Sequence, residues 1–403
     1  MKQSSNVVVN GPLEAHLEGY RHELSRRGYS SSATIRHLQL MAHLSRWLMQ
    51  NDVDPADFDQ QRHEHFLADR RASGYVRFRT SRGLIPIVDY LRSQGVVPGS
   101  VPSIPVDPDA ILLEGFVNYL YNERSLAEST VVWHRRVASS FLRASQSADN
   151  GNNLIGLTAG EVHAFVLAEC SRRSVGSANN VVSALRALLR FLYLQGHVAS
   201  PLADSVPRVA TWRDGGRSKA LSDRQIDALL TSCDRRRKAG RRDFAILTVL
   251  ARLGLRAAEV ASLTLDDIYW RSGEVAVTGK GNRADRLPLP NDVGRALAEY
   301  CERGRARNTC RALFLHVRAP YGALSPSAVS HVVLRASERA GIAPVRAHRL
   351  RHSVASMMRR AGAPLFEIGQ VLRHGHMTTT AVYAKDDLDA LAGIARPWPG
   401  ALA

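Results

Sequence analysis

The chain has 403 residues and is 45% hydrophobic, so it is too long for one ordinary core and apolar enough to fold throughout, which excludes a mainly disordered protein. Its formal net charge of +17 is expected to attract a polyanion, because each phosphate that Lys or Arg neutralises releases condensed counterions. Nucleic acid is therefore the expected partner class.

Cysteine usage and hydrophobic runs indicate the cellular setting. The four cysteines, at positions 170, 233, 301 and 310, have neither close pairing nor zinc-site spacing, so we expect no disulfide framework. We also expect no metal and no cofactor. No stretch approaches the roughly 18 apolar residues of a membrane span, and the N-terminus lacks the apolar segment of a signal peptide. We expect a soluble protein of the bacterial cytoplasm, associated with the nucleoid and not with a membrane.

Two stretches rich in helix-breaking residues divide the chain. Prolines cluster in Val97–Pro108, and prolines and a glycine pair occur in Ala199–Lys219. The predicted domains are therefore 1–107, 108–212 and 213–403, the last of which includes a C-terminal tail.

The first two parts are similar to each other. Gly19-Tyr20 matches Gly115-Phe116, and after a short insertion Tyr90-Leu91 matches Phe191-Leu192. Apolar residues recur every three or four positions in both parts, which predicts helices with one buried face. We interpret the two parts as a tandem repeat of one helical unit, and the first copy has two open roles, DNA contact or protein contact.

The third part begins with helices and then contains a short sheet. Ser222 is the expected N-cap of one helix, and a second helix at 243–253 is expected to end at Gly254. The segments 273–278 and 285–289 alternate like strands on either side of a glycine-rich turn. The predicted fold is mostly α, with a small β-sheet in the C-terminal domain.

Residues suited to phosphodiester chemistry occur in this third part. Cleavage without a metal needs cations around the phosphorus, an in-line nucleophile and an acid for the leaving oxygen. Arg256 follows the helix-ending Gly254, and Glu259, three residues later, can face it from a new helix. Lys280 lies between two glycines at the hairpin tip, where it suits a general acid, although a lysine in a tight turn is ordinarily only exposed.

Two further segments supply histidine, arginine and tyrosine. His348 and Arg351 are three residues apart at the start of a predicted helix, so they can project to one face as a proton shuttle and a phosphate clamp. His374 precedes Tyr383 by nine positions. A second histidine, His376, shares this segment, and the spacing to the tyrosine favours His374.

From Leu221 to Leu391 the sequence resembles the tyrosine recombinase family, which includes phage integrases. The family pattern is an arginine in Gly-Leu-Arg-x-x-Glu, a hairpin lysine, a His-x-x-Arg pair, a histidine or tryptophan, and a tyrosine, and all occur here in order. The resemblance implies a tyrosine recombinase catalytic fold, preceded here by two helical SAM-like, core-binding-like domains. Arg373 departs from the common Leu-Gly-His-Ser form of the family.

The resemblance also implies a role for each candidate residue. These roles are phosphate binding for Arg256 and Arg351, protonation of the departing 5′ oxygen for Lys280, proton transfer at the tyrosine for His348, a hydrogen bond to the phosphate for His374, and nucleophilic attack for Tyr383. Because the resulting 3′-phosphotyrosyl link retains the bond energy, a 5′ hydroxyl can reverse the reaction without ATP or a metal.

The predicted function is site-specific recombination of double-stranded DNA for integration, excision or transposition of mobile DNA. The resemblance implies a homotetramer that acts on two specific sites. A type IB topoisomerase shares the tyrosine chemistry and is the first alternative. A catalytically idle DNA-binding architectural protein is the second, but it would lack catalytic positions. A metal enzyme using His348 and His352 is disfavoured, because no Glu lies between them as the zincin pattern requires.

Overall fold

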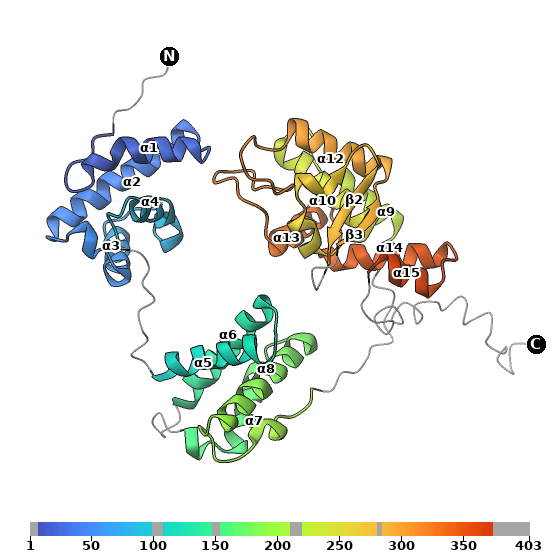
Figure 1. Ribbon diagram of the computed structural model, residues 1–403, viewed down its shortest axis with the longest axis horizontal. Helices are drawn as coiled ribbons and strands as arrows, with labels where there is room; N and C mark the ends of the chain where they lie inside the picture. The colour runs from blue at the N-terminus through green and yellow to red at the C-terminus, as the bar shows by residue number, and fades with distance from the viewer. Residues whose placement is uncertain (1–6, 99–107, 147–153, 210–219, 280–283, 374–403) are drawn as a thin grey trace, which may run out of the picture. The chain divides into compact units, whose positions relative to one another are not determined.

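The computed structural model is mostly helical with one small sheet, as the sequence predicts (Figure 1). Contacts divide the chain into two units, 100–214 and a unit that combines 1–99 with 215–403. No helix in the described part of the chain is long and apolar enough to cross a membrane. The residues that the structure describes are 7–98, 108–146, 154–209, 220–279 and 284–373.

Four helices surround the hydrophobic core of residues 7–98. Two of them begin at residues whose side chains cap the helix: Ser30 accepts a hydrogen bond from the N–H of Ala33 (3.4 Å), and Asp59 accepts one from the N–H of Arg62 (2.9 Å). The apolar faces of all four helices are buried together. The helices are α1 (Leu17–Arg26), α2 (Ser31–Gln50), α3 (Gln60–Ala72) and α4 (Ser81–Ser93).

Four helices also surround a separate core in the second part. Thr158 and Glu161 form a reciprocal capping box at the start of one helix, and Ser174 caps the next by accepting from the N–H of Ser177. Val181, Leu185, Leu188 and Leu192, which recur every three or four positions along the sequence, are buried in this core. The helices are α5 (Pro108–Asn122), α6 (Glu128–Gln146), α7 (Ala159–Cys170) and α8 (Val175–Leu194).

Matching positions of the two helical parts make matching contacts. A Cβ atom added to Gly19 would lie 2.1 Å from the Tyr90 hydroxyl, and one added to Gly115 would lie 3.3 Å from the ring of Phe191. The ring of Tyr20, which follows Gly19, lies 5.2 Å from the ring of Tyr90, centroid to centroid. The ring of Phe116, which follows Gly115, lies 5.5 Å from the ring of Phe191. Residues paired by sequence matching thus occupy equivalent places in two four-helix units.

The third part combines a three-stranded antiparallel sheet, in the order β1-β2-β3, with a helical layer. Ser222 caps its first helix as predicted, whereas the second helix begins at Lys238, earlier than the predicted Asp243. Both predicted strands are present, and Val275 pairs with Leu287. The elements are α9 (Asp223–Thr231), α10 (Lys238–Leu253), α11 (Ala257–Ser262), β1 (Ile268–Tyr269), β2 (Glu274–Thr278), β3 (Ala284–Pro288), α12 (Asn291–Arg303), α13 (Pro326–Arg339), α14 (Ala347–Arg360) and α15 (Leu365–Val371).

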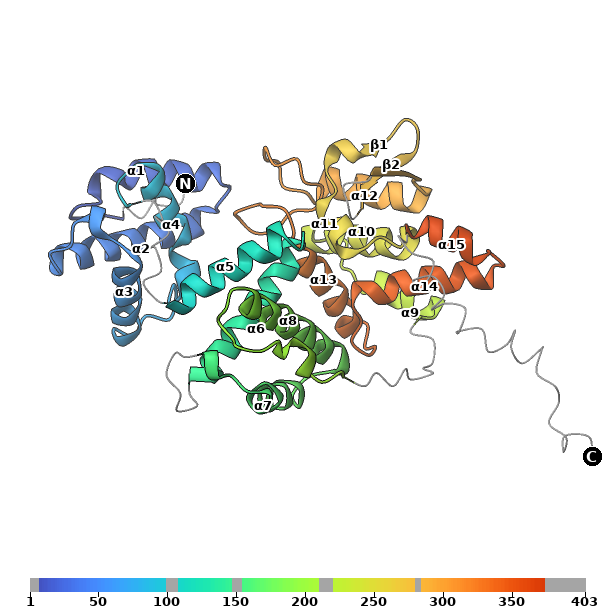
Figure 2. The same ribbon diagram turned by 60° about the horizontal axis from the view of Figure 1, so that its bottom comes forward.

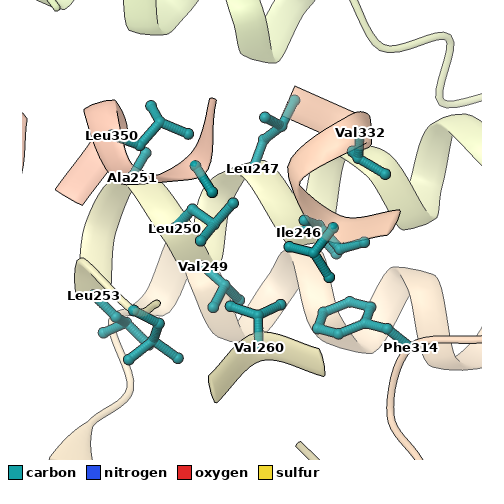
Figure 3. Close-up of a cluster of buried hydrophobic side chains, with 14 of the residues drawn as sticks. Ile246, Leu247, Val249, Leu250, Ala251, Leu253, Val260, Phe314, Val332 and Leu350 are labelled. Atoms are coloured by element: carbon teal, nitrogen blue, oxygen red, sulfur yellow. The ribbon is translucent and has the colours of Figure 1, made fainter. Parts of the chain in front are cut away.

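Helix α10 is the centre of this core. Figure 3 shows its side chains meeting Val260 of α11, Val332 of α13 and Leu350 of α14. Helix α15 packs against α14 through a small cluster that includes Ile368 and Leu372 (Figure 2). Because α10 is buried on several sides, its last turn is fixed relative to both α11 and α14. The candidate residues that the structure describes lie near the end of α10 and the starts of α11 and α14.

Candidate catalytic site

Arg256 lies at the junction between α10 and α11. Helix α10 ends at Gly254, whose φ of +60° is the left-handed conformation that favours glycine, and a Cβ atom there would lie 2.8 Å from Leu372. Arg256 then begins α11: its backbone N–H and its guanidinium Nη1 each donate to the Glu259 carboxylate at 2.7 Å. The predicted pairing of Arg256 with Glu259 is thus present.

Arg351 enters the same junction from α14. Its side chain is 2% exposed, and its Nη1 donates to the carbonyl of Gly254 at 2.7 Å. Its Nη2 donates to the carbonyl of Leu372, at the end of α15. A buried guanidinium needs such acceptors, and these two carbonyls are left without intrahelical partners by the ends of α10 and α15.

Arg373 lies beside Arg256 and Arg351 at the same junction. From the sequence alone it is only a departure from the family pattern. Its side chain is 7% exposed, and its Nη2 donates to Glu259 at 2.7 Å. Its backbone has a φ of +54°, a conformation that disfavours residues with a Cβ atom and that the glycine of the common pattern adopts more readily. The ion pair with Glu259 offsets that strain.

The two candidate phosphate-binding arginines converge on adjacent carbonyls. Arg256 donates from Nη2 to the carbonyl of Arg373 at 3.4 Å, while Arg351 donates to the carbonyl of Leu372. These carbonyls directly precede His374 in the chain. Segments around 256, 351 and 373 therefore form one cationic cluster.

Glu259 connects this cluster electrostatically. Its side chain is 4% exposed, and burial by itself would raise the pKa of the carboxyl. Burial is the largest single influence, but the hydrogen bond from the backbone of Arg256, the charge of Arg373 and the side-chain hydrogen bonds from both arginines together outweigh it. They hold the pKa of Glu259 below its usual value. Glu259 is consequently ionised at neutral pH and orients two arginines.

Replacing Glu259 with glutamine is expected to destabilise the protein by about 3 kcal/mol at pH 7, because it leaves two guanidinium groups without their buried counter-ion. Since the folded-state pKa is lowered, the contribution of the carboxylate is fully present above its unfolded pKa and is lost as pH falls through the folded value. The difference between wild type and E259Q should therefore shrink in acid. Denaturant unfolding measured from pH 7 to acid pH checks this.

The control for this experiment is Glu274→Gln, which removes the exposed ion pair with Arg286 and should change the free energy of unfolding by less than about 1 kcal/mol. An E259Q variant as stable as E274Q would contradict the role assigned to Glu259.

His348 differs from Arg351 in exposure, although both lie on α14 one turn apart. The imidazole of His348 is exposed, and its Nε2 lies 3.0 Å from Nε2 of His352. Arg351 instead points into the junction between helix ends. Within the described ranges, no group of three or more His, Cys, Asp or Glu side chains is placed to hold a metal ion.

Three of the six candidates lie outside the described residues: Lys280, His374 and Tyr383. The alternative histidine, His376, also lies outside them. Strand β2 ends directly before the segment of Lys280, and β3 begins after it. The geometry on which the site rests is therefore that of Arg256, Arg351 and their partners.

Comparison with known proteins relates this arrangement to one family. Residues 219–389 match the model of the phage integrase family, and residues 113–196 match the N-terminal SAM-like domain of phage integrases. A Sinorhizobium fredii protein named as an integrase/recombinase, y4rA, is 37% identical over 97% of this chain and 95% of its own length. The tyrosine recombinase XerC of Roseiflexus is 30% identical over 67% of this chain and 88% of its own length.

Solved structures share the fold. A lambda integrase tetramer bound to a Holliday junction superposes with a TM-score of 0.54 at 16% identity, over 80% of this chain and 90% of that one. The XerH site-specific recombinase bound to its difH substrate gives a TM-score of 0.51 at 18% identity, over 72% of this chain and 97% of that one.

Proposed function

Because the chain belongs to the phage integrase family and is a tyrosine recombinase that breaks and rejoins DNA strands, we propose that Tyr383 is its nucleophile and Arg256 and Arg351 are its phosphate clamp. The observation that carries the proposal is the convergence of these two arginines on the adjacent carbonyls of Leu372 and Arg373. Two guanidinium groups held this close can stabilise the charge that develops on a phosphorane.

The two arginines have different surroundings. Arg256 has a side chain that is 39% exposed, and its hydrogen bond to the carbonyl of Arg373 is long, at 3.4 Å, so a phosphate oxygen can replace that acceptor. Arg351 is buried beneath the junction. Glu259 keeps Arg256 oriented before the substrate arrives, which lowers the reorganisation needed for catalysis.

The proposed step is a phosphoryl transfer in which the Tyr383 oxygen forms a bond to phosphorus as the bond to the 5′ oxygen breaks. The exposed His348 accepts the phenol proton, Lys280 donates a proton to the departing 5′ oxygen, and His374 binds the phosphate. Attack by a 5′ hydroxyl of a partner strand then releases Tyr383. The number of phosphoester bonds is conserved, so ATP is not required.

We also propose an organisation and a setting. The three largest hydrophobic cores, one in each part of the chain, favour the domains 1–107, 108–212 and 213–403. The lambda integrase structure is a tetramer on a Holliday junction, which supports a tetramer on two sites for this chain. We place its action in the bacterial cytoplasm at the nucleoid, in integration, excision or transposition of mobile DNA.

The test uses the full chain and a nicked suicide duplex that carries inverted repeats from the DNA flanking its gene. Covalent protein–DNA adduct is expected in the presence of a chelator, with the modified peptide mapping to Tyr383. Failure to form any adduct on such duplexes would contradict the proposal. A substrate with two sites separates recombination from the topoisomerase alternative, because a type IB topoisomerase would relax supercoiled DNA without exchanging strands between sites.

A further inference from the structure

The end of α3, the start of α4 and the connection between them carry an exposed group of four arginines, which we call the arginine ridge. The sequence 70–88 holds five arginines and no Asp or Glu, whereas residues 7–98 as a whole hold 12 arginines, no lysine and 10 Asp or Glu, which is nearly neutral. The positive charge is therefore local to this connection. The arginine ridge consists of Arg71, Arg77, Arg79 and Arg82, all with exposed side chains.

Contacts among Arg70, His43 and Tyr75 hold the connection in place. Arg70 is 5% exposed, and its Nε donates to the backbone carbonyl of Arg77 at 3.2 Å. The guanidinium of Arg70 lies 4.1 Å from the ring centroid of Tyr75 and is hydrogen-bonded to Nδ1 of His43. Tyr75 in turn stacks on His43 with centroids 4.6 Å apart. These contacts attach the loop to α2.

Phe78 provides the second anchor of the loop. Its ring packs 4.9 Å from that of His37, centroid to centroid, so the ring points inward while its neighbours Arg77 and Arg79 remain exposed. Burial, with a smaller contribution from nearby arginines, lowers the pKa of both His37 and His43 to about 4. Both imidazoles are neutral at pH 7. The side chains that hold the loop therefore add only one positive charge, that of Arg70.

The ridge arginines also differ from several other arginines of these helices in their partners. Across residues 7–98, no carboxylate lies within 4.0 Å of any ridge guanidinium, so their donors remain available to an anion. Four arginines of the same helical unit do have carboxylate partners; these are Arg21 with Glu18, Arg26 and Arg27 with Glu23, and Arg62 with Asp59.

The corresponding connection of the second helical unit, between α7 and α8, has a different charge pattern. Its Arg173 is ion-paired with Glu169. That connection, residues 171–174, holds only one further arginine, the exposed Arg172, so a group of four exposed arginines is not repeated there.

The start of α4 adds a second feature that favours an anion. Arg82 lies in the first turn of this 13-residue helix, and that turn holds no acidic side chain. The side chain of Thr80, the N-cap, makes no capping hydrogen bond. The positive end of the helix dipole therefore lies beside the ridge, which complements phosphate oxygens.

We propose that the arginine ridge binds the phosphate backbone of double-stranded DNA, so that the N-terminal helical unit is an additional DNA clamp. This rests on the proposed function, in which the chain holds duplex DNA during strand exchange. The guanidinium fork matches phosphate oxygens bidentately, and contacts of this kind position a protein on DNA without reading sequence. The ridge should therefore strengthen binding to every duplex to a similar extent.

The test compares two full-length variants that lose the same charge. In the ridge variant, Arg71, Arg77, Arg79 and Arg82 are changed to Gln. In the matched control, the four carboxylate-paired arginines of the same unit, Arg21, Arg26, Arg27 and Arg62, are changed to Gln. Affinity for a duplex of arbitrary sequence is measured over a range of salt concentrations, and circular dichroism verifies that both variants are folded.

The ridge variant is expected to bind at least about tenfold more weakly at low salt, and its slope of log K against log salt should fall by about 0.9 for each phosphate that the ridge no longer neutralises. The control should retain nearly the wild-type slope. Equal slopes in the two variants, or a ridge variant that loses only self-association on DNA, would overturn the proposal. Adduct formation by the wild type on the suicide duplex reports separately on the proposed function.

Discussion

Replacing Tyr383 with phenylalanine is expected to abolish covalent attachment of the protein to DNA while leaving DNA binding unchanged. The substitution removes only the phenol oxygen, which is the atom proposed to bond to phosphorus. Loss of a nucleophile typically reduces the rate by on the order of 10⁴-fold or more. Binding should persist, because it depends on arginines that contact phosphates.

The measurement is the fraction of labelled suicide duplex that becomes attached to protein over time, with affinity measured in parallel. Tyr269→Phe is a suitable control, because Tyr269 lies on β1, is exposed and contacts Arg286 through its ring face, which phenylalanine retains. Attachment that persists in Y383F would refute the assignment of the nucleophile. Loss of attachment in both variants would indicate a general effect of the substitutions.

Replacing Arg351 with alanine is the second large effect, and it is expected on both activity and stability. Loss of one donor to the developing phosphorane charge should slow adduct formation by about 10²- to 10³-fold. The change also leaves the carbonyls of Gly254 and Leu372 without their donor, which costs about 1–3 kcal/mol for each buried group. Both the rate of DNA cleavage and the free energy of unfolding should therefore decrease.

A comparison with Arg351→Lys separates the two contributions. Lysine keeps the charge but cannot donate to both carbonyls in the planar geometry of a guanidinium, so partial recovery of stability without full recovery of cleavage is expected. Arg335→Ala, an exposed change on α13, is the control and should leave both properties near wild type. Adduct formation by R351A at the wild-type rate, at a temperature where it is folded, would contradict the phosphate-clamp role.

Several local features followed from the sequence because they depend on neighbouring residues alone. The Ser222 cap, the helix end at Gly254 and the alternating strands around the glycine turn are all set by backbone preferences and short-range hydrogen bonds. The pairing of Arg256 with Glu259 belongs to the same class, because three residues separate them at the start of one helix.

Other features required contacts between distant segments. In the sequence, Arg373 is only an unusual residue in a motif. The structure shows that its guanidinium Nη2 lies 2.7 Å from the carboxylate of Glu259. Likewise, periodicity placed His348 and Arg351 on one helix but did not reveal that only Arg351 is buried at the ends of α10 and α15. Such contacts are set by the packing of α10, α14 and α15.

The sequence by itself determined the order of the chemical groups, the helical repeat and the family to which the chain belongs, because these depend on residue type and spacing. The tertiary structure decided which carbonyls receive the two arginines and which arginines of the first helical unit remain exposed without a carboxylate partner. The physical reason is that burial and ion pairing depend on side chains brought together from distant positions, and no local pattern encodes their distances.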